Sequence, residues 1–310
     1  MKLPTISAFL PLTSALTCWT PLPPLPLGPR QEHSVTALSN FIYVVGGLLN
    51  STTVTPTIPT FDTLSKSWSQ APPLPTPLHH PSIAALDGKL YVLGGLLNLK
   101  GADWRPVSAA WVLQPNGTWS DLPPPPPGAE VGSAAVGVIG SKIYLAGGLT
   151  RRGSGMVPVD GVSVYDTAAR TWSQGPPLPE ARDHGGGAVV GGTMYVIGGR
   201  MGSVRTNRAT VWALDVEKGG KWAVKKEMPT ARGGVAVVKA GERIYVFGGE
   251  GNNAPGTRGV FGEVEGKMRV ARHGMGAVEV GGSIYVPGGG ATQSGSAPVE
   301  EFDAFRPGTC

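Results

Sequence analysis

The chain has 310 residues and a formal net charge of +5. Its basic residues are spread without a Lys/Arg run, which argues against a nucleic-acid-binding protein, and no apolar stretch is long enough to span a bilayer. We therefore expect neither nucleic acid nor membrane as a partner. The 47 glycines and 30 prolines exceed ordinary usage. Because they recur between apolar runs, they indicate the turns of a β-fold rather than disorder.

The first residues have the pattern of a targeting segment. Lys2 precedes the mostly apolar stretch Ile6–Leu16, and Ala15 and Thr17 are small enough for a cleavage site. We predict a signal peptide over residues 1–17 and a location in the secretory pathway or outside the cell.

Two features agree with secretion. Asn50 and Asn116 each begin an Asn-X-Ser/Thr triplet in a predicted loop, so both are predicted glycosylation sites. The two cysteines, Cys18 and Cys310, lie at the two ends of the mature chain. In a secreted chain an even pair indicates a disulfide, which can form only if the fold brings the termini together.

One short phrase recurs six times, an apolar run containing Tyr that ends in a glycine pair: IYVVGG, LYVLGG, IYLAGG, MYVIGG, IYVFGG and IYVPGG. The first glycines of the pairs are Gly46, Gly94, Gly147, Gly198, Gly248 and Gly288. Successive steps of 48, 53, 51, 50 and 40 residues are typical of radially stacked β-sheets. Six units around one axis make a single domain, residues 18–310.

The fourth repeat shows the expected strands of one unit. Strand a, Gly186–Val190, turns at Gly191-Gly192 into strand b, Met194–Ile197, which ends at the glycine pair. A long loop leads to strand c, Val211–Leu214, and strand d carries Trp222. Four antiparallel strands predict a propeller blade. The other tight turns are expected at Ser39-Asn40, Asp87-Gly88, Gly140-Ser141, Gly241-Glu242 and Gly281-Gly282.

This pattern resembles the kelch-repeat β-propellers, in the glycine pair, the Tyr before it and a Trp about 22 to 25 residues after it. The tryptophans concerned are Trp68, Trp119, Trp172 and Trp222. The resemblance implies an all-β, six-bladed kelch-type propeller in which these residues pack blade against blade. The fifth repeat lacks the Trp, so we expect Val260–Val264 and Met268–Val270 to form a short outer edge.

The two ends of the chain complement each other. Pro298–Phe302 is the expected strand c of the sixth blade, and no Trp follows it, whereas Trp19 begins a strand d pattern. We predict that the N-terminal strand closes the ring as the outermost strand of the sixth blade and protects its edge. This would place Cys18 beside Cys310, and a disulfide there would stabilise the fold by roughly 4 to 5 kcal/mol.

The strand order puts the long b–c and d–a loops on one face, here called the upper face, and the start of each strand a at the mouth of the central channel. Sixteen residues before each first glycine stand Arg30, Leu78, Val131, Arg182, Arg232 and Arg272. One to three places later come all five histidines, His33, His79, His80, His184 and His273, with Glu32, Glu130 and Asp183 in the same windows.

Two interpretations of this cluster are open. Arg and His recur near this position in kelch repeats, where they join blades; alternatively they supply proton donors and an anion clamp in a concave site. On the second interpretation the candidate catalytic residues are His184, Arg182, Arg232, Arg272 and His273. The candidate substrate-binding residues are His33, His79, His80, Glu32, Asp183, Trp104 and Arg200. Trp104 either covers a blade or forms an aromatic wall.

Several chemistries have no sequence support. Neither an internal Cys nor a nucleotide-binding glycine motif is present. The histidines come from separate repeats without ligand spacing. We therefore expect no cofactor and no metal.

The organisation of the chain resembles the fungal kelch-type cyclases of secondary metabolism, including hetero-Diels–Alderases that join a quinone methide to a terpene. The resemblance implies a secreted enzyme that cyclises an apolar or aromatic small molecule without a cofactor, by polarising a carbonyl and holding the reactants together. The alternatives are a secreted carbohydrate- or protein-binding module without turnover, and a sugar epimerase like the periplasmic kelch mutarotases.

Overall fold

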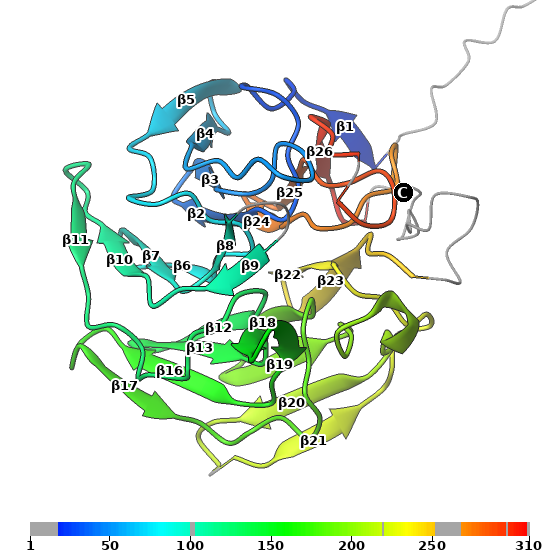
Figure 1. The fold of residues 1–310 in the computed structure, drawn as a ribbon. Helices are drawn as coiled ribbons and strands as arrows, with labels where there is room; N and C mark the ends of the chain where they lie inside the picture. Colours follow the sequence, from blue (N-terminus) through cyan, green and yellow to red (C-terminus); the bar gives the residue numbers. More distant parts are fainter. Residues whose placement is uncertain (1–17, 100–102, 219, 252–267, 296, 309–310) are drawn as a thin grey trace, which may run out of the picture.

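The computed structural model describes residues 18–99, 103–218, 220–251, 268–295 and 297–308. Six sheets surround a central axis (Figure 1). The predicted signal peptide and Cys310 lie outside the described residues, so the signal peptide and the disulfide stay predictions. Among the described residues, no helix is long and apolar enough to cross a bilayer.

From the inside outward, the first blade consists of β2 (Ser34–Leu38), β3 (Phe41–Val45), β4 (Ile58–Asp62) and β5 (Ser67–Ala71). The second consists of β6 (Ile83–Leu86), β7 (Lys89–Leu93), β10 (Ala110–Leu113) and β11 (Trp119–Asp121). The third consists of β12 (Ala135–Ile139), β13 (Lys142–Ala146), β16 (Val162–Asp166) and β17 (Thr171–Gln174). The fourth consists of β18 (Gly186–Val190), β19 (Thr193–Ile197), β20 (Val211–Asp215) and β21 (Trp222–Lys225).

The described part of the fifth blade is β22 (Ala236–Ala240) and β23 (Arg243–Phe247), and the sixth consists of β24 (Val278–Val280), β25 (Ser283–Pro287), β26 (Phe302–Phe305) and β1 (Trp19–Pro21). On the upper face, the b–c loops of the second and third blades form the hairpins β8 (Leu96–Leu99) with β9 (Asp103–Pro106), and β14 (Leu149–Arg152) with β15 (Gly155–Pro158). The b–c loop of the fourth blade contains a short 3-10 helix, η1 (Val204–Thr206). The six predicted a–b turns all lie where the sequence placed them.

Two strand predictions at the ends of repeats are wrong. Met268–Val270 forms no strand; Met268 is instead buried in the core cluster beside Phe247. The third strand of the sixth blade is Phe302–Phe305 rather than Pro298–Phe302, because Phe302 and Phe305 supply the buried aromatic side chains at this edge. Val260–Val264 lies outside the described residues.

The glycine pairs join each blade to the next. The amide of the second glycine donates to the carbonyl oxygen of the residue sixteen before the next first glycine, at 2.7 to 2.9 Å in all six cases. A side chain on the first glycine would collide with that same carbonyl; at Gly198, for example, a Cβ would lie 2.8 Å from the Arg232 oxygen. The pair must therefore be glycine for the blades to approach this closely.

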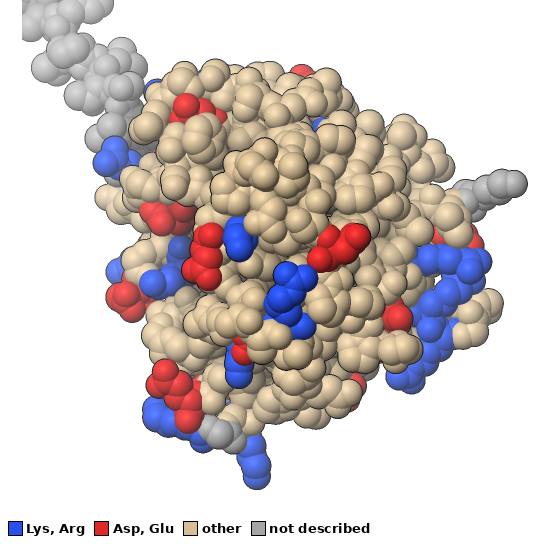
Figure 2. All heavy atoms as spheres, turned by 90° about the vertical axis from the view of Figure 1, so that its left-hand side faces the viewer, with Lys and Arg blue, Asp and Glu red and all other residues tan. Residues whose placement is uncertain are grey.

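The strand d tryptophans add a second contact between blades. The indole N–H of Trp172 donates to the Pro123 carbonyl at 2.8 Å, and Trp222 donates to Pro176 at 2.9 Å. Trp68 and Trp119 make the same bond to the preceding blade. On the side of the propeller shown in Figure 2, charged side chains of both signs are interspersed.

The N-terminal strand closes the ring, as predicted. β1 pairs with β26, with Trp19 opposite Phe305, and the Arg306 amide donates to the Cys18 carbonyl at 2.9 Å. Trp19 is buried, and its ring lies 5.5 Å from Phe247 and 5.0 Å from Phe305. The closing strand thus contributes a large side chain to the core between the fifth and sixth blades.

Replacing Trp19 with Ala should lower the free energy of unfolding by about 3 to 5 kcal/mol, because it empties a buried aromatic site. Urea denaturation measures the change. Trp222→Phe, which removes only one partly exposed hydrogen bond, is the matched control and should cost about 1 kcal/mol. An equal, small loss for both variants would contradict closure through Trp19.

Candidate functional site

The four arginines sixteen residues before the first glycines belong to the blade framework. All are buried, and each donates through Nη1 to the carbonyl of the first glycine of its own blade. Arg272 also pairs with buried Asp303 at 2.7 Å. Arg182, Arg232 and Arg272 thus bond to the backbone of their own blades, and this geometry favours the blade-joining interpretation.

His33 likewise joins two blades. Its Nε2 lies 3.0 Å from the Pro287 carbonyl of the sixth blade. Burial lowers its pKa to about 3, so it is neutral at physiological pH. Its geometry favours a structural contact rather than substrate binding.

Six residues, each fourteen positions before a first glycine, surround the channel, and we call them the channel ring. They are Glu32, His80, Ser133, His184, Gly234 and Gly274. Each backbone amide donates to the ring residue of the preceding blade at 2.6 to 3.1 Å, to the carbonyl in five cases and to the Ser133 hydroxyl in the case of His184. These hydrogen bonds run around the whole ring, so the backbone fixes the positions from which the ring side chains extend.

Every channel-ring residue has a left-handed backbone, with φ between 50° and 64°. This conformation suits Gly234 and Gly274, but costs a residue with a Cβ about 1 to 2 kcal/mol. Four positions nevertheless carry side chains. Strained residues of this kind concentrate at functional sites, so the channel ring is a candidate functional site.

Three of these side chains meet in the channel. His80 Nε2 lies 2.9 Å from a Glu32 carboxylate oxygen and 3.0 Å from His184 Nε2. A Cβ at Gly274 would lie 2.5 Å from the Glu32 carboxylate. Glycine at this position therefore makes room for Glu32 to reach the histidines.

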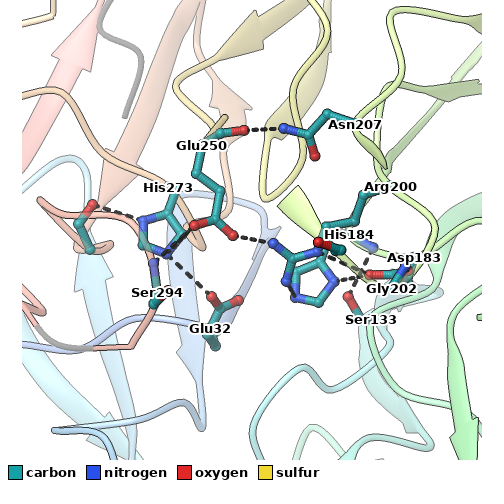
Figure 3. A network of polar contacts seen from close by, with 12 residues as sticks. Glu32, Ser133, Asp183, His184, Arg200, Gly202, Asn207, Glu250, His273 and Ser294 are labelled. Carbon is teal, nitrogen blue, oxygen red and sulfur yellow. Dashed lines mark hydrogen bonds and ion pairs between the residues drawn. The ribbon is translucent and has the colours of Figure 1, made fainter. Parts of the chain in front are cut away.

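A charged network continues from His184 across the upper face (Figure 3). Asp183 accepts from His184 Nδ1 at 2.5 Å and from Arg200 Nε at 3.2 Å. Arg200 also pairs with Glu250, whose other oxygen lies 3.7 Å from His273 Nε2. Arg200 thus lies between two carboxylates, with only 14% of its side chain exposed.

The electrostatics of this network keep its carboxylates ionised. Burial alone would raise the pKa values of Glu32, Asp183 and Glu250, but neighbouring histidines and, for the last two, Arg200 outweigh it and lower them. Burial, helped by Arg200, lowers the pKa of His184 despite Asp183. Burial and the charge of His80 lower the pKa of His79 to about 3.

A cavity of about 300 Å³ lies on the upper side of the ring. Its lining includes Gln31, Trp104, Arg200, Glu250 and His273, and it reaches Glu32 and His184 of the ring. All six ring residues line a neck of about 100 Å³, and beyond the neck the inner strands enclose a channel of about 470 Å³. We call the first space the upper cavity.

Polar atoms around the upper cavity lack partners. Among the described residues, both amide atoms of Gln31, the indole nitrogen of Trp104 and His273 Nε2 are buried without a hydrogen bond. An unpaired buried polar group costs about 1 to 3 kcal/mol. Their residues line the upper cavity, so a bound molecule that reached these atoms would remove this cost.

Trp104 lies over the histidines. It comes from β9, and its ring centroid lies 4.8 Å from that of His79 and 5.2 Å from that of His80. Asp103 beside it pairs with Arg151 of β14 at 2.6 Å, which joins the two upper hairpins. Trp104 thus lines the upper cavity, and its role as an aromatic wall for a ligand stays a prediction.

Sequence reasoning named most of this cluster but missed Gln31, Ser133 and Glu250. A signal for them existed: Gln31 and Ser133 lie fifteen and fourteen residues before a first glycine. Glu250 and Arg200 both lie two residues after one. Asn50 and Asn116, the predicted glycosylation sites, are exposed; their modification stays a prediction.

Stability should fall as the pH drops below about 6.5. His33 and His79 have pKa values of about 3 when folded and about 6.5 when unfolded, so the unfolded chain takes up protons that the folded chain cannot. Each histidine should cost about 2 kcal/mol at pH 5.

Urea unfolding at pH 7.5 and pH 5 measures this loss, and His33→Gln should reduce it by about 2 kcal/mol. Stability that is unchanged between the two pH values would contradict the buried, neutral state of both histidines.

Comparison with known proteins identifies the family. The chain matches the KLHDC2/KLHL20/DRC7 Kelch-repeats domain over residues 82–261. It is 33% identical over 264 residues to Kelch-like protein terF of Aspergillus terreus, covering 80% of this chain and 56% of that protein. It is 28% identical over 262 residues to Kelch-like protein 35 of Mus musculus, covering 84% of this chain and 41% of that protein. The chain therefore spans about half the length of the curated relatives it matches.

The solved structure of YjhT superposes with a TM-score of 0.75, covering 90% of this chain and 95% of that chain at 16% identity. This likeness shows a shared fold. With a family match over more than half of its length and six blades joined by glycine pairs, the chain belongs to the kelch-repeat β-propeller proteins.

Proposed function

We propose that this kelch propeller binds a small molecule in the upper cavity and catalyses its cyclisation without a redox cofactor. The proposed reaction is of the hetero-Diels–Alder type and joins a quinone methide to a terpene. The observation that carries the proposal is that Gln31, Trp104 and His273 line this cavity and each has a buried polar atom without a hydrogen bond in the described structure.

These atoms suit an oxygen-bearing ligand. The Gln31 amide offers one donor group and one acceptor, Trp104 offers a donor, and Arg200, which lines the same cavity, adds a guanidinium. A carbonyl oxygen that enters the cavity would satisfy the donors and remove their desolvation cost. The face of Trp104 suits a planar, apolar ring next to that carbonyl.

The reaction needs little else from the protein. In a hetero-Diels–Alder addition, one C–O and one C–C bond form from the π electrons of the two reactants, and no group leaves. Donors on the quinone methide oxygen, from Gln31 and Arg200, would polarise it, and the cavity walls would hold the partner in reactive geometry. Such preorganised positioning is worth several kcal/mol.

Two further points support the proposal. Four of the six channel-ring positions carry a side chain on strained backbone, although glycine fits there. The chain also shares its organisation with fungal kelch-type cyclases and is similar to a fungal kelch-like protein. We further propose that it acts in the secretory pathway or outside the cell, where its exposed Asn50 and Asn116 would be glycosylated.

The test incubates the purified chain with a quinone methide generated in solution and a terpene alkene, and separates the products on a chiral column. We expect one stereoisomer in excess over the uncatalysed mixture. Gln31→Leu and Trp104→Phe should each lower the rate about tenfold or more, because each removes a donor worth about 1 to 3 kcal/mol. Trp222→Phe, on the outer strand, should not change it.

A racemic product at the uncatalysed rate would overturn the cyclisation. If calorimetry then showed that a sugar binds, the chain would be either a binding module or an epimerase. Conversion of a single anomer into the other would identify an epimerase, and binding without conversion would identify a binding module.

A further inference from the structure

We propose that Glu32, His80 and His184 bind one divalent transition-metal ion of the Zn²⁺ type at the neck of the channel. Their ligand atoms all lie within 4.8 Å of one another. Two imidazole nitrogens and one carboxylate are a ligand set that Zn²⁺ uses in catalytic sites. The inference does not depend on the proposed cyclisation, because metal binding is measured on the chain itself.

The ligand atoms point at one another across the neck. The Nε2 atoms of His80 and His184 lie 3.0 Å apart, and a Glu32 oxygen lies 2.9 Å from the first of them. Ligand atoms bound at about 2.0 to 2.2 Å around a tetrahedral ion lie slightly farther apart than this. Small side-chain movements therefore make room for an ion, while the channel-ring backbone stays in place.

Neighbouring side chains orient both imidazoles as metal sites require. His184 Nδ1 lies 2.5 Å from Asp183, and His80 Nδ1 lies 2.6 Å from His79 Nδ1. A carboxylate on Nδ1 fixes the tautomer that leaves the Nε2 lone pair available, and it is a recurrent partner of zinc-bound histidine. Asp183 is therefore a positioning residue for the ion.

The charge of the site also favours a cation. Among the described residues, Glu32, Asp183 and Glu250 supply three carboxylates to the network, and the guanidinium of Arg200 pairs with the last two. Before any charge on the imidazoles is counted, these four side chains carry two negative charges in a largely buried network. Uncompensated buried charge is costly, and one divalent ion would balance it.

Binding of the ion requires that one contact of Arg200 opens. Its Nη2 lies 3.0 Å from His184 Nε2, where it competes with the ion for the same lone pair. Arg200 keeps its contacts with Asp183 and Glu250 if this one opens. The neck also borders the upper cavity through Glu32 and His184, so the ion would have an open position facing a bound molecule.

Cobalt titration tests the site. The full chain, stripped with EDTA, is titrated with Co²⁺ and followed by its visible absorption, which is intense in tetrahedral coordination. We expect one equivalent to bind, Zn²⁺ to displace it, and the melting temperature to rise with either ion. Glu32→Gln and His184→Gln should abolish stoichiometric binding, and Asp183→Asn should weaken it about 10- to 100-fold.

His33→Gln is the matched control, because His33 Nε2 contacts the Pro287 carbonyl and His33 is not one of the three ligand residues, and it should bind Co²⁺ like the original chain. Circular dichroism of each variant checks that it is folded. Failure of the folded original chain to bind Co²⁺, or equal binding by it and folded Glu32→Gln, would overturn the site. Cyclisation that persists after EDTA would not contradict the metal site, because metal binding and cyclisation are measured separately.

Discussion

The same hydrogen bond recurs between each blade of this propeller and the next: the amide of a second glycine donates to a carbonyl across the interface. The bond sets how closely the blades approach, and that spacing excludes a side chain on the first glycine. The carbonyl belongs to the residue two places before the channel ring. The contact that assembles the blades therefore also fixes the ring on which the site is built.

In the channel ring, backbone stability favours glycine, whereas the proposed function needs side chains. Left-handed backbone favours glycine, and the fifth and sixth blades follow that preference with Gly234 and Gly274. The other four blades place Glu32, His80, Ser133 and His184 there. Gly274 also leaves space on one side of the channel, into which the Glu32 carboxylate extends. Sixfold backbone regularity and unequal side chains together produce an asymmetric, charged neck.

Periodicity was sufficient to predict the six blades, the a–b turns and the closing strand at Trp19, because these depend on local turn chemistry and on one repeated spacing. It also predicted that the histidines surround the channel. It could not separate the inward-facing His80 and His184 from the framework residues Arg182 and His33, since one or two positions along the chain decide which way a side chain points. The contacts of His80 with Glu32 and His184 join three blades, so no short spacing in the sequence reports them.

We infer that the side chains of the channel ring serve binding and not folding. The most direct test compares the free energy of unfolding of the original chain with that of the double variant His80→Gly, His184→Gly. Glycine relieves two left-handed residues, about 1 to 2 kcal/mol each, which offsets the lost hydrogen bonds. We predict that the double variant is at least as stable as the original chain. A loss of several kcal/mol would show instead that these histidines hold the propeller together.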